Sequence, residues 1–211
     1  GNGSIRMEGT TDGCTLSNNC HGVEFGHTLG TVATNIISTK ATGTAISISG
    51  STINSTSSDS VGLSAWNQTS SNPLNIKATG GGKIVLTGNT TSQNTVCATR
   101  LNGTNVIGAG DIEITSTNKC LTLAPYAGDT KNVVIGAETN ASAAPGNVIL
   151  KADDIQFNNH LTTIRNSGNL VLESNSASFS AAQVINSARI AIDGTNQFRW
   201  GKTGNSADLT L

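Results

Sequence analysis

A short aliphatic phrase recurs along the chain and limits the folds that it can adopt. In each copy a small residue and a polar residue precede two aliphatic residues that are separated by one position. The copies begin at Gly82, Gly110, Gly146, Gly168, Ala188 and Ala207, and a related phrase begins at Lys131. Their first aliphatic residues are mostly about 20 residues apart, a spacing typical of stacked structural repeats.

Alternation within each phrase predicts a short, half-buried strand. Ile84 and Leu86 would share one face of an extended chain and Val85 would lie on the other. A unit of about 20 residues cannot bury its own apolar face, so the units must stack on one another. The hydrophobic fraction of 36% is mostly aliphatic and only 3% of residues are aromatic, which favours a narrow core. We therefore predict an all-β, right-handed parallel β-solenoid (β-helix) with coils of about 20 residues and little or no helix.

Two other structures compete with the solenoid. An antiparallel sandwich would use hairpin turns such as Asn-Gly, but this step occurs only at Asn2 and Asn102. Disorder would fit the abundance of Ser and Gly, yet the chain has three prolines and many β-branched residues, which prefer extended backbone. The scarcity of hairpin steps argues against the sandwich, and the few prolines and many β-branched residues argue against disorder.

The phrase is regular over residues 81–211 and less regular over residues 1–80. A polar stretch rich in Ser and Thr near residues 51–72 predicts a longer loop or an insertion, and we expect the two parts to form one continuous stack. Related segments lie near both ends of the chain. They predict strands at Ile5 and Met7, and at Leu209 and Leu211, that could stack end to end on identical subunits or neighbouring coils. The sequence could therefore be a processed product or a fragment of a longer protein.

Four cysteines predict two disulfides. Cys14 and Cys20 could close a local loop, whereas Cys97 and Cys120 are separated by about one coil, which would bring their Cα atoms within disulfide range. We predict these two pairs, and disulfides would place the chain outside the cytosol, extracellular or at the cell surface. A metal site is the competing interpretation, but only Cys20 and His21 have the close spacing that zinc ligands favour.

Charge and hydropathy argue against two classes of partner. The formal net charge is −1 and no basic run occurs, so nothing attracts nucleic acid. No stretch approaches the roughly 20 apolar residues of a transmembrane helix. We expect no nucleic-acid partner and no membrane insertion.

Few residues form a recognisable catalytic pattern. The three histidines are scattered, and common nucleophile, phosphate-loop and zinc motifs are missing from the sequence. Some β-solenoids are carbohydrate-active enzymes that use paired carboxylates, and Asp153 and Asp154 would be the candidates here. We expect no catalytic, cofactor-binding or metal site. Trp66 would cap one end of the core or offer a stacking platform to a sugar.

The phrases at Gly146–Ile155 and Gly168–Ser174 resemble the repeats of filamentous haemagglutinin-like adhesins. Those are large bacterial exoproteins exported by two-partner secretion or related routes, and autotransporter passengers use similar repeats. The resemblance covers about residues 80–211 and implies a rigid surface fibre without catalytic residues. Cysteines are uncommon in such repeats, and Asn72-Pro73 stands without the context of the secretion domain.

The sequence thus favours a non-enzymatic segment of a secreted or cell-surface fibre, an adhesin-like shaft. Cell-surface carbohydrate or protein receptors are candidate partners. A self-assembling filament or sheath subunit is the first alternative, and a carbohydrate-active β-helix enzyme is the second.

Overall fold

The computed structural model is built entirely from strands. It describes residues 3–15, 20–26, 33–67, 73–92, 97–124, 132–140, 146–180, 183–201 and 209–210. No helix occurs in these ranges, and none that could span a membrane.

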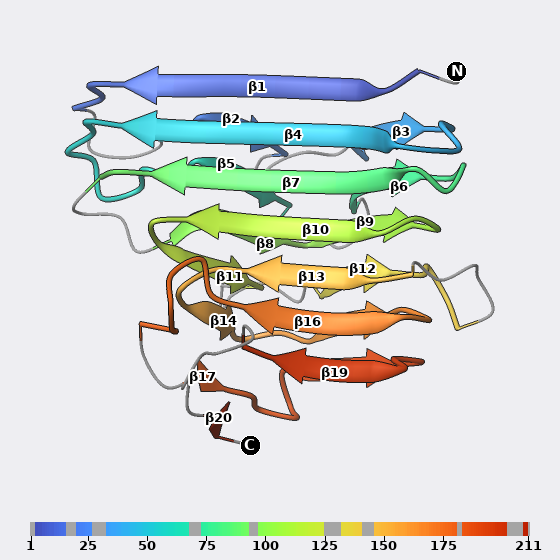
Figure 1. Ribbon diagram of the computed structural model, residues 1–211. Coiled ribbons are helices and arrows are strands. Elements are labelled where there is room, and N and C mark those ends of the chain that lie inside the picture. The colour runs from blue at the N-terminus through green and yellow to red at the C-terminus, as the bar shows by residue number, and fades with distance from the viewer. Residues whose placement is uncertain are drawn as a thin grey trace.

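Three parallel sheets make up most of the structure. The chain passes through them in turn, so that each strand pairs with the strand that lies one coil away (Figure 1). Sheet A has seven strands: β1 (Ile5–Asp12), β4 (Thr44–Ile53), β7 (Lys83–Thr90), β10 (Ile112–Thr117), β13 (Val148–Lys151), β16 (Asn169–Glu173) and β19 (Gln197–Trp200). The all-β, parallel, β-helix-like class is confirmed.

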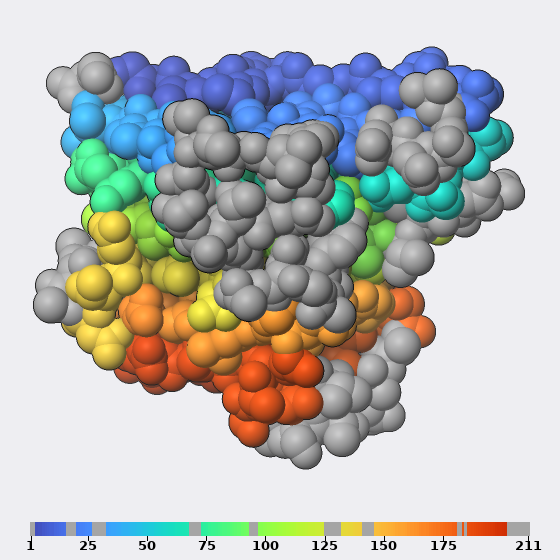
Figure 2. Space-filling model, turned by 180° about the vertical axis from the view of Figure 1, so that it is seen from behind, coloured from blue at the N-terminus to red at the C-terminus, as the bar shows by residue number. Residues whose placement is uncertain are grey.

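The other strands form two longer sheets and one short pair. Sheet B has β2 (Val23–Phe25), β5 (Leu63–Trp66), β8 (Cys97–Asn102), β11 (Cys120–Leu123) and β14 (Ile155–Phe157). Sheet C has β3 (Asn35–Ser38), β6 (Leu74–Ala78), β9 (Thr104–Gly108), β12 (Val133–Gly136), β15 (Thr162–Arg165) and β18 (Ile190–Asp193). A separate parallel pair joins β17 (Gln183–Val184) to β20 (Leu209–Thr210). The coils are layered in chain order, as the view from behind also shows (Figure 2).

Most of the coils are longer than the spacing of the phrases predicted. In the narrow part of sheet A the register partner of Val148 is Leu170, close to the expected spacing, but the partner of Ile5 is Ile46, far beyond it. The period was underestimated because the phrases at Val133 and Ile190 belong to sheet C, whereas those at Ile112 and Val148 belong to sheet A. Strands on two faces of one coil look alike in sequence because both alternate toward the same core.

Aliphatic rows run the length of the stack and form its core. One row in sheet A is Ile5, Ile46, Ile84, Ile112, Val148, Leu170 and Phe198, and the next is Met7, Ile48, Leu86, Ile114, Leu150, Leu172 and Trp200. Every member from the second to the sixth is fully buried. Residues one coil apart therefore bury one another, which is why a unit of low hydrophobicity can be stable here.

Polar side chains also stack from coil to coil. The Nδ2 of Asn75 donates to the Oδ1 of Asn35, and the Nδ2 of Asn105 donates to the Oδ1 of Asn75, both over 2.9 Å. A second ladder runs at the bend before sheet A, where the backbone N–H of Asn147 donates to Asp111 and that of Asn169 donates to Asn147. A Cβ on Gly168 would overlap the carbonyl oxygen of Gly146, so this bend requires a small residue.

The Ser/Thr-rich stretch near residues 51–72 is not a simple loop. It contains the end of β4 and the whole of β5, joined by a segment in which Ser55, Ser57 and Ser60 are buried. The hydroxyls of Ser55 and Ser60 lie 2.6 Å apart, and that of Ser55 also donates to the carbonyl of Cys14. Residues 54–62 form a loop between the two strands, and the hydroxyls of its buried serines bond to one another and to backbone carbonyls inside the coil.

Candidate functional site

The two ends of the stack expose the rows that are buried in its middle. At the N-terminal end Ile5 and Met7 of β1 are only partly buried, although their neighbours Ile46 and Ile48 are inaccessible. At the C-terminal end Phe198 of β19 is 40% exposed while Leu170, one coil away, is 0% exposed. Within the described ranges, each end is therefore an apolar strip on a strand of sheet A that pairs on one side only.

The predicted stacking residues are only partly brought to matching positions. Ile5 and Met7 lie on the edge strand of sheet A, as expected. Leu209 lies in β20, which pairs with β17 and not with sheet A, so it does not continue the row of Ile5. Leu211 lies outside the described residues. The residue that ends the Ile5 row is Phe198, which keeps the alternation of the phrase but replaces the aliphatic residue by an aromatic one.

Both predicted disulfides are present. Cys14 is bonded to Cys20, with Cα atoms 6.1 Å apart, and Cys97 to Cys120, with Cα atoms 4.2 Å apart. Cys97 and Cys120 are register partners in β8 and β11, so their bond links two successive coils. Two disulfides are typical of a protein that folds in an oxidising environment outside the cytoplasm.

A buried polar cluster centred on Arg100 joins the first three coils. In sheet B Glu24, Ser64 and Arg100 are successive register partners, and Arg100 is 7% exposed. Its guanidinium donates to both carboxylate oxygens of Asp59, at 2.9 and 3.3 Å. It also donates to the hydroxyl of Ser64 at 3.3 and 3.2 Å. One cationic side chain thus connects β8, β5 and the segment between β4 and β5.

His21 and Trp66 complete this cluster. The Nε2 of His21 is 3.2 Å from the Nη2 of Arg100, and its Nδ1 is 3.0 Å from a carboxylate oxygen of Glu24. Arg100 lies over the ring of Trp66, with its Cζ 5.0 Å from the centroid. Trp66 therefore stacks on an internal cation, and neither of its expected roles accounts for that contact.

Asp59 carries the clearest electrostatic signature of the cluster. Burial acts to raise its pKa, but the hydrogen bond with His21 and the charge of Arg100 outweigh that effect and lower the pKa to about 2. The carboxylate consequently stays ionised at neutral pH. Its role is to neutralise a buried cation, and no alternation or motif in the sequence pointed to this pairing.

The carboxylates that could serve catalysis are engaged in separate structural contacts. Asp153 accepts hydrogen bonds from the backbone and hydroxyl of Ser176, and Asp154 accepts from Gln156 and Gln183. Glu113 pairs with Lys83 at 2.6 Å on the outer face of sheet A. Within the described residues, no group of three or more His, Cys, Asp or Glu side chains could hold a metal ion. The expectation of a non-enzymatic protein stays a prediction.

Comparison with known proteins gives no relative to set beside this geometry. No family model, curated protein or solved structure matches the chain.

Proposed function

We propose that the chain is a non-enzymatic structural segment of a secreted or cell-surface fibre, an adhesin-like shaft wound as a right-handed parallel β-solenoid. The observation that carries this proposal is the opening of the core rows at both ends. The row of Ile5 and Phe198 is fully buried at each coil between them and exposed at its last member.

Such ends favour further strands over solvent. Among the strands that the structure describes, the edge strands β1 and β19 pair on one side only, beside partly exposed apolar side chains. An added coil would satisfy both at once, because a parallel strand supplies hydrogen bonds and a further member of each row. Neighbouring coils of a longer chain are the first partner that we propose.

The coil-to-coil ladders suit a rigid shaft. The ladder that joins Asn35, Asn75 and Asn105 and the one that joins Asp111, Asn147 and Asn169 run along the stack, in the direction in which a fibre bears load. The disulfide between Cys97 and Cys120 crosses between coils in the same direction. Together with the resemblance to haemagglutinin-like repeats, these links support an extracellular or cell-surface location, with carbohydrate or protein receptors as partners.

Surface labelling of intact source cells tests this role. Antibodies raised against the folded chain should label fibres on the outside of unpermeabilised cells in electron micrographs. The purified chain alone should appear as a compact particle, about 30 Å along the stack for seven strands at the usual spacing. Labelling that appears only after permeabilisation would contradict the proposal.

A self-assembling filament or sheath subunit is the alternative, and the exposure of Phe198 specifically favours it. If copies stack end to end, the sedimentation coefficient of the purified protein should rise with concentration and long rods should form. Phe198→Asp should abolish this growth. Ile149→Asp is the matched control, because Ile149 is a partly buried aliphatic residue of β13, which pairs with β10 and β16 and lies at neither end of the stack. A single short species at every concentration would reject self-assembly and leave the shaft proposal standing.

A further inference from the structure

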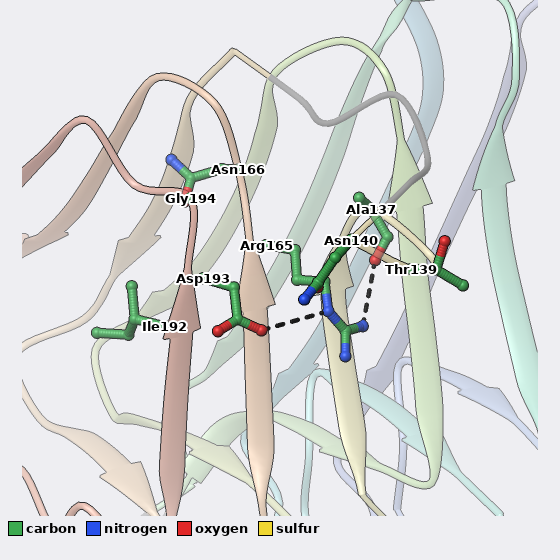
Figure 3. A pocket seen from close by; sticks show the side chains of 8 residues that line it. All are labelled: Ala137, Thr139, Asn140, Arg165, Asn166, Ile192, Asp193 and Gly194. Atoms are coloured by element: carbon green, nitrogen blue, oxygen red, sulfur yellow. Dashed lines mark hydrogen bonds and ion pairs between the residues drawn. The ribbon is translucent and has the colours of Figure 1, made fainter.

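A polar pocket lies where the last strands of sheet C end. Its volume is about 380 Å³, within the range of small-ligand sites. Arg165 comes from β15, Asp193 from β18, and Asn140 from the segment that follows β12 (Figure 3). The remaining lining residues are Ala137, Thr139, Asn166, Ile192 and Gly194.

Arg165 is held in place by the backbone more than by its acidic neighbour. Its Nη1 donates to the carbonyl oxygens of Glu138 at 3.1 Å and Ala137 at 3.5 Å. Its Nε lies 3.5 Å from a carboxylate oxygen of Asp193, longer than the about 2.7–2.9 Å of a strong charge-assisted hydrogen bond. The guanidinium is therefore fixed in orientation while both charged groups keep hydrogen-bonding capacity.

Asn166 adds an unused donor to the wall of the pocket. Asn166 is 1% exposed, and its Oδ1 accepts a hydrogen bond from the hydroxyl of Thr195 at 2.6 Å. Its Nδ2 has no hydrogen-bond partner within the part of the chain that the structure describes. Buried amide groups normally have partners, so this donor marks the wall as incompletely satisfied.

The charges and the lining limit what could bind. Arg165 and Asp193 neutralise each other, so neither an anion nor a cation is favoured. Ile192 points away from Arg165, and the eight residues drawn in Figure 3 include no aromatic side chain for an apolar ligand. The pocket offers a hydrogen-bond donor in Arg165, an acceptor in Asp193 and an amide in Asn140 that can donate or accept.

We propose that this pocket binds one unit of a neutral saccharide. Neighbouring hydroxyls of a sugar ring would accept from Arg165 and donate to Asp193, while Asn140 would contact a third hydroxyl. Without an aromatic platform the affinity should be weak, so that several copies along a fibre would be needed for firm attachment. The site does not depend on the shaft role, because it is formed by successive coils of one chain, those of β12, β15 and β18.

A glycan panel and two point variants test the proposal. The purified chain should bind neutral glycans in preference to sialylated or sulfated ones at equal density. Asp193→Asn and Arg165→Gln should each lower the affinity about tenfold or more, as expected for losing a hydrogen bond to a charged group. Arg199→Gln is the control, because Arg199 pairs with Glu173 on sheet A, away from the pocket. It should bind as the unmodified chain does.

Chemical-shift mapping with the bound sugar supplies a second readout. The backbone amides of Asn140, Asn166 and Gly194 should shift on titration, which does not require any variant to fold. Binding only to acidic glycans, no binding to neutral glycans at millimolar concentration, unchanged affinity in Asp193→Asn, or shifts confined to another face would each overturn the proposal.

Discussion

The N-terminal coils and the C-terminal coils use the same aliphatic rows but different devices around them. In sheet A the strands β1, β4 and β7 have 8, 10 and 8 residues, whereas β13, β16 and β19 have 4, 5 and 4, a taper that Figure 1 shows clearly. The Cys14–Cys20 disulfide and the Arg100 cluster lie in the wide coils, and the Cys97–Cys120 disulfide joins the coil of β7 to that of β10.

The extra length of the wide coils is polar. Beyond Ile48 and Leu86 the inward positions become Gly50 and Gly88, and then Thr52 and Thr90. A Cβ on Gly50 would overlap the carbonyl oxygen of Gly62. The glycines therefore let β4 pass close to the backbone around Gly62 in the same chain. The hydroxyl of Thr52 donates to the carbonyls of Cys20 and Val61. The wide coils are therefore extended by close backbone contact and hydrogen bonds, and the narrow coils rely on apolar burial.

The largest loss of stability should be the same in the wide and the narrow coils. Leu86 and Leu150 occupy the same row, and both are fully buried. Leu86→Ala and Leu150→Ala should each lower the free energy of unfolding by about 3–5 kcal/mol through lost burial and a cavity. Urea denaturation measures both. Unequal losses, with only one variant affected, would show that the row does not run through the whole stack.

Removing the arginine of the buried Arg100 cluster should cost more stability than removing an arginine of the narrow coils. Arg100→Ala leaves Asp59 partly buried without its cation and should cost about 3 kcal/mol of stability. Arg199→Ala removes an exposed ion pair with Glu173 and should cost less than about 1 kcal/mol. Denaturation of the two variants in parallel gives the difference. Similar small losses would mean that the cluster contributes nothing to the wide coils.

The close approach of Gly50 to the backbone of Gly62 in the wide coils predicts a smaller loss of stability. Gly50→Ala forces β4 away from Gly62 and should cost about 2 kcal/mol, because backbone must move. The comparison is Gly146→Ala in the narrow coils, where the added Cβ meets only the side-chain oxygen of Asp111. Thermal unfolding should show a clear loss for the first variant and little change for the second. The reverse order would contradict the assigned contacts.

The smallest expected effect is a pH dependence that belongs to the wide coils. The pKa of Asp59 is lowered to about 2 in the folded state, below the 3.8 of an unperturbed group. Its contribution is therefore present above about pH 4 and is lost as the pH falls toward 2, by about 1 kcal/mol after allowance for solvent screening. Urea midpoints of the unmodified chain and Asp59→Asn should converge over that interval. A constant difference would exclude Asp59 as the source.

Local patterns in the sequence predicted the strands and the disulfides but not the coil. Alternation around Ile84 or Leu170 reports which residues face the core, and this was right at each of these strands. It cannot report which sheet a strand joins, so the strands of sheets A and C form one series in the sequence and the predicted coil is too short. The cysteine pair was predicted correctly because Cys97 and Cys120 lie on neighbouring strands of a single sheet.

The Arg100 cluster could not be predicted because its members are far apart in sequence. His21, Asp59 and Arg100 meet only after three coils have stacked, and none of them stands in a motif. Serines in the segment from residue 54 to 62 predicted a longer loop or an insertion but gave no sign of burial, and their hydroxyls bond to one another and to backbone carbonyls inside the coil. The pocket at Arg165 has the same origin, since β12, β15 and β18 supply it from separate coils.

Cysteine cross-linking tests whether the parallel stack keeps a fixed register through wide and narrow coils alike. Ser47 is the register partner of Val85 in the wide coils, and Ile149 is that of Val171 in the narrow ones. Paired cysteine variants at 47 and 85, and at 149 and 171, should each form a disulfide on mild oxidation of the native protein, identified by peptide mass mapping. Pairs shifted by one residue, at 47 and 86 or at 149 and 172, should not, because the partner then faces the core. Cross-linking of the shifted pairs, or failure of both register pairs, would contradict the account.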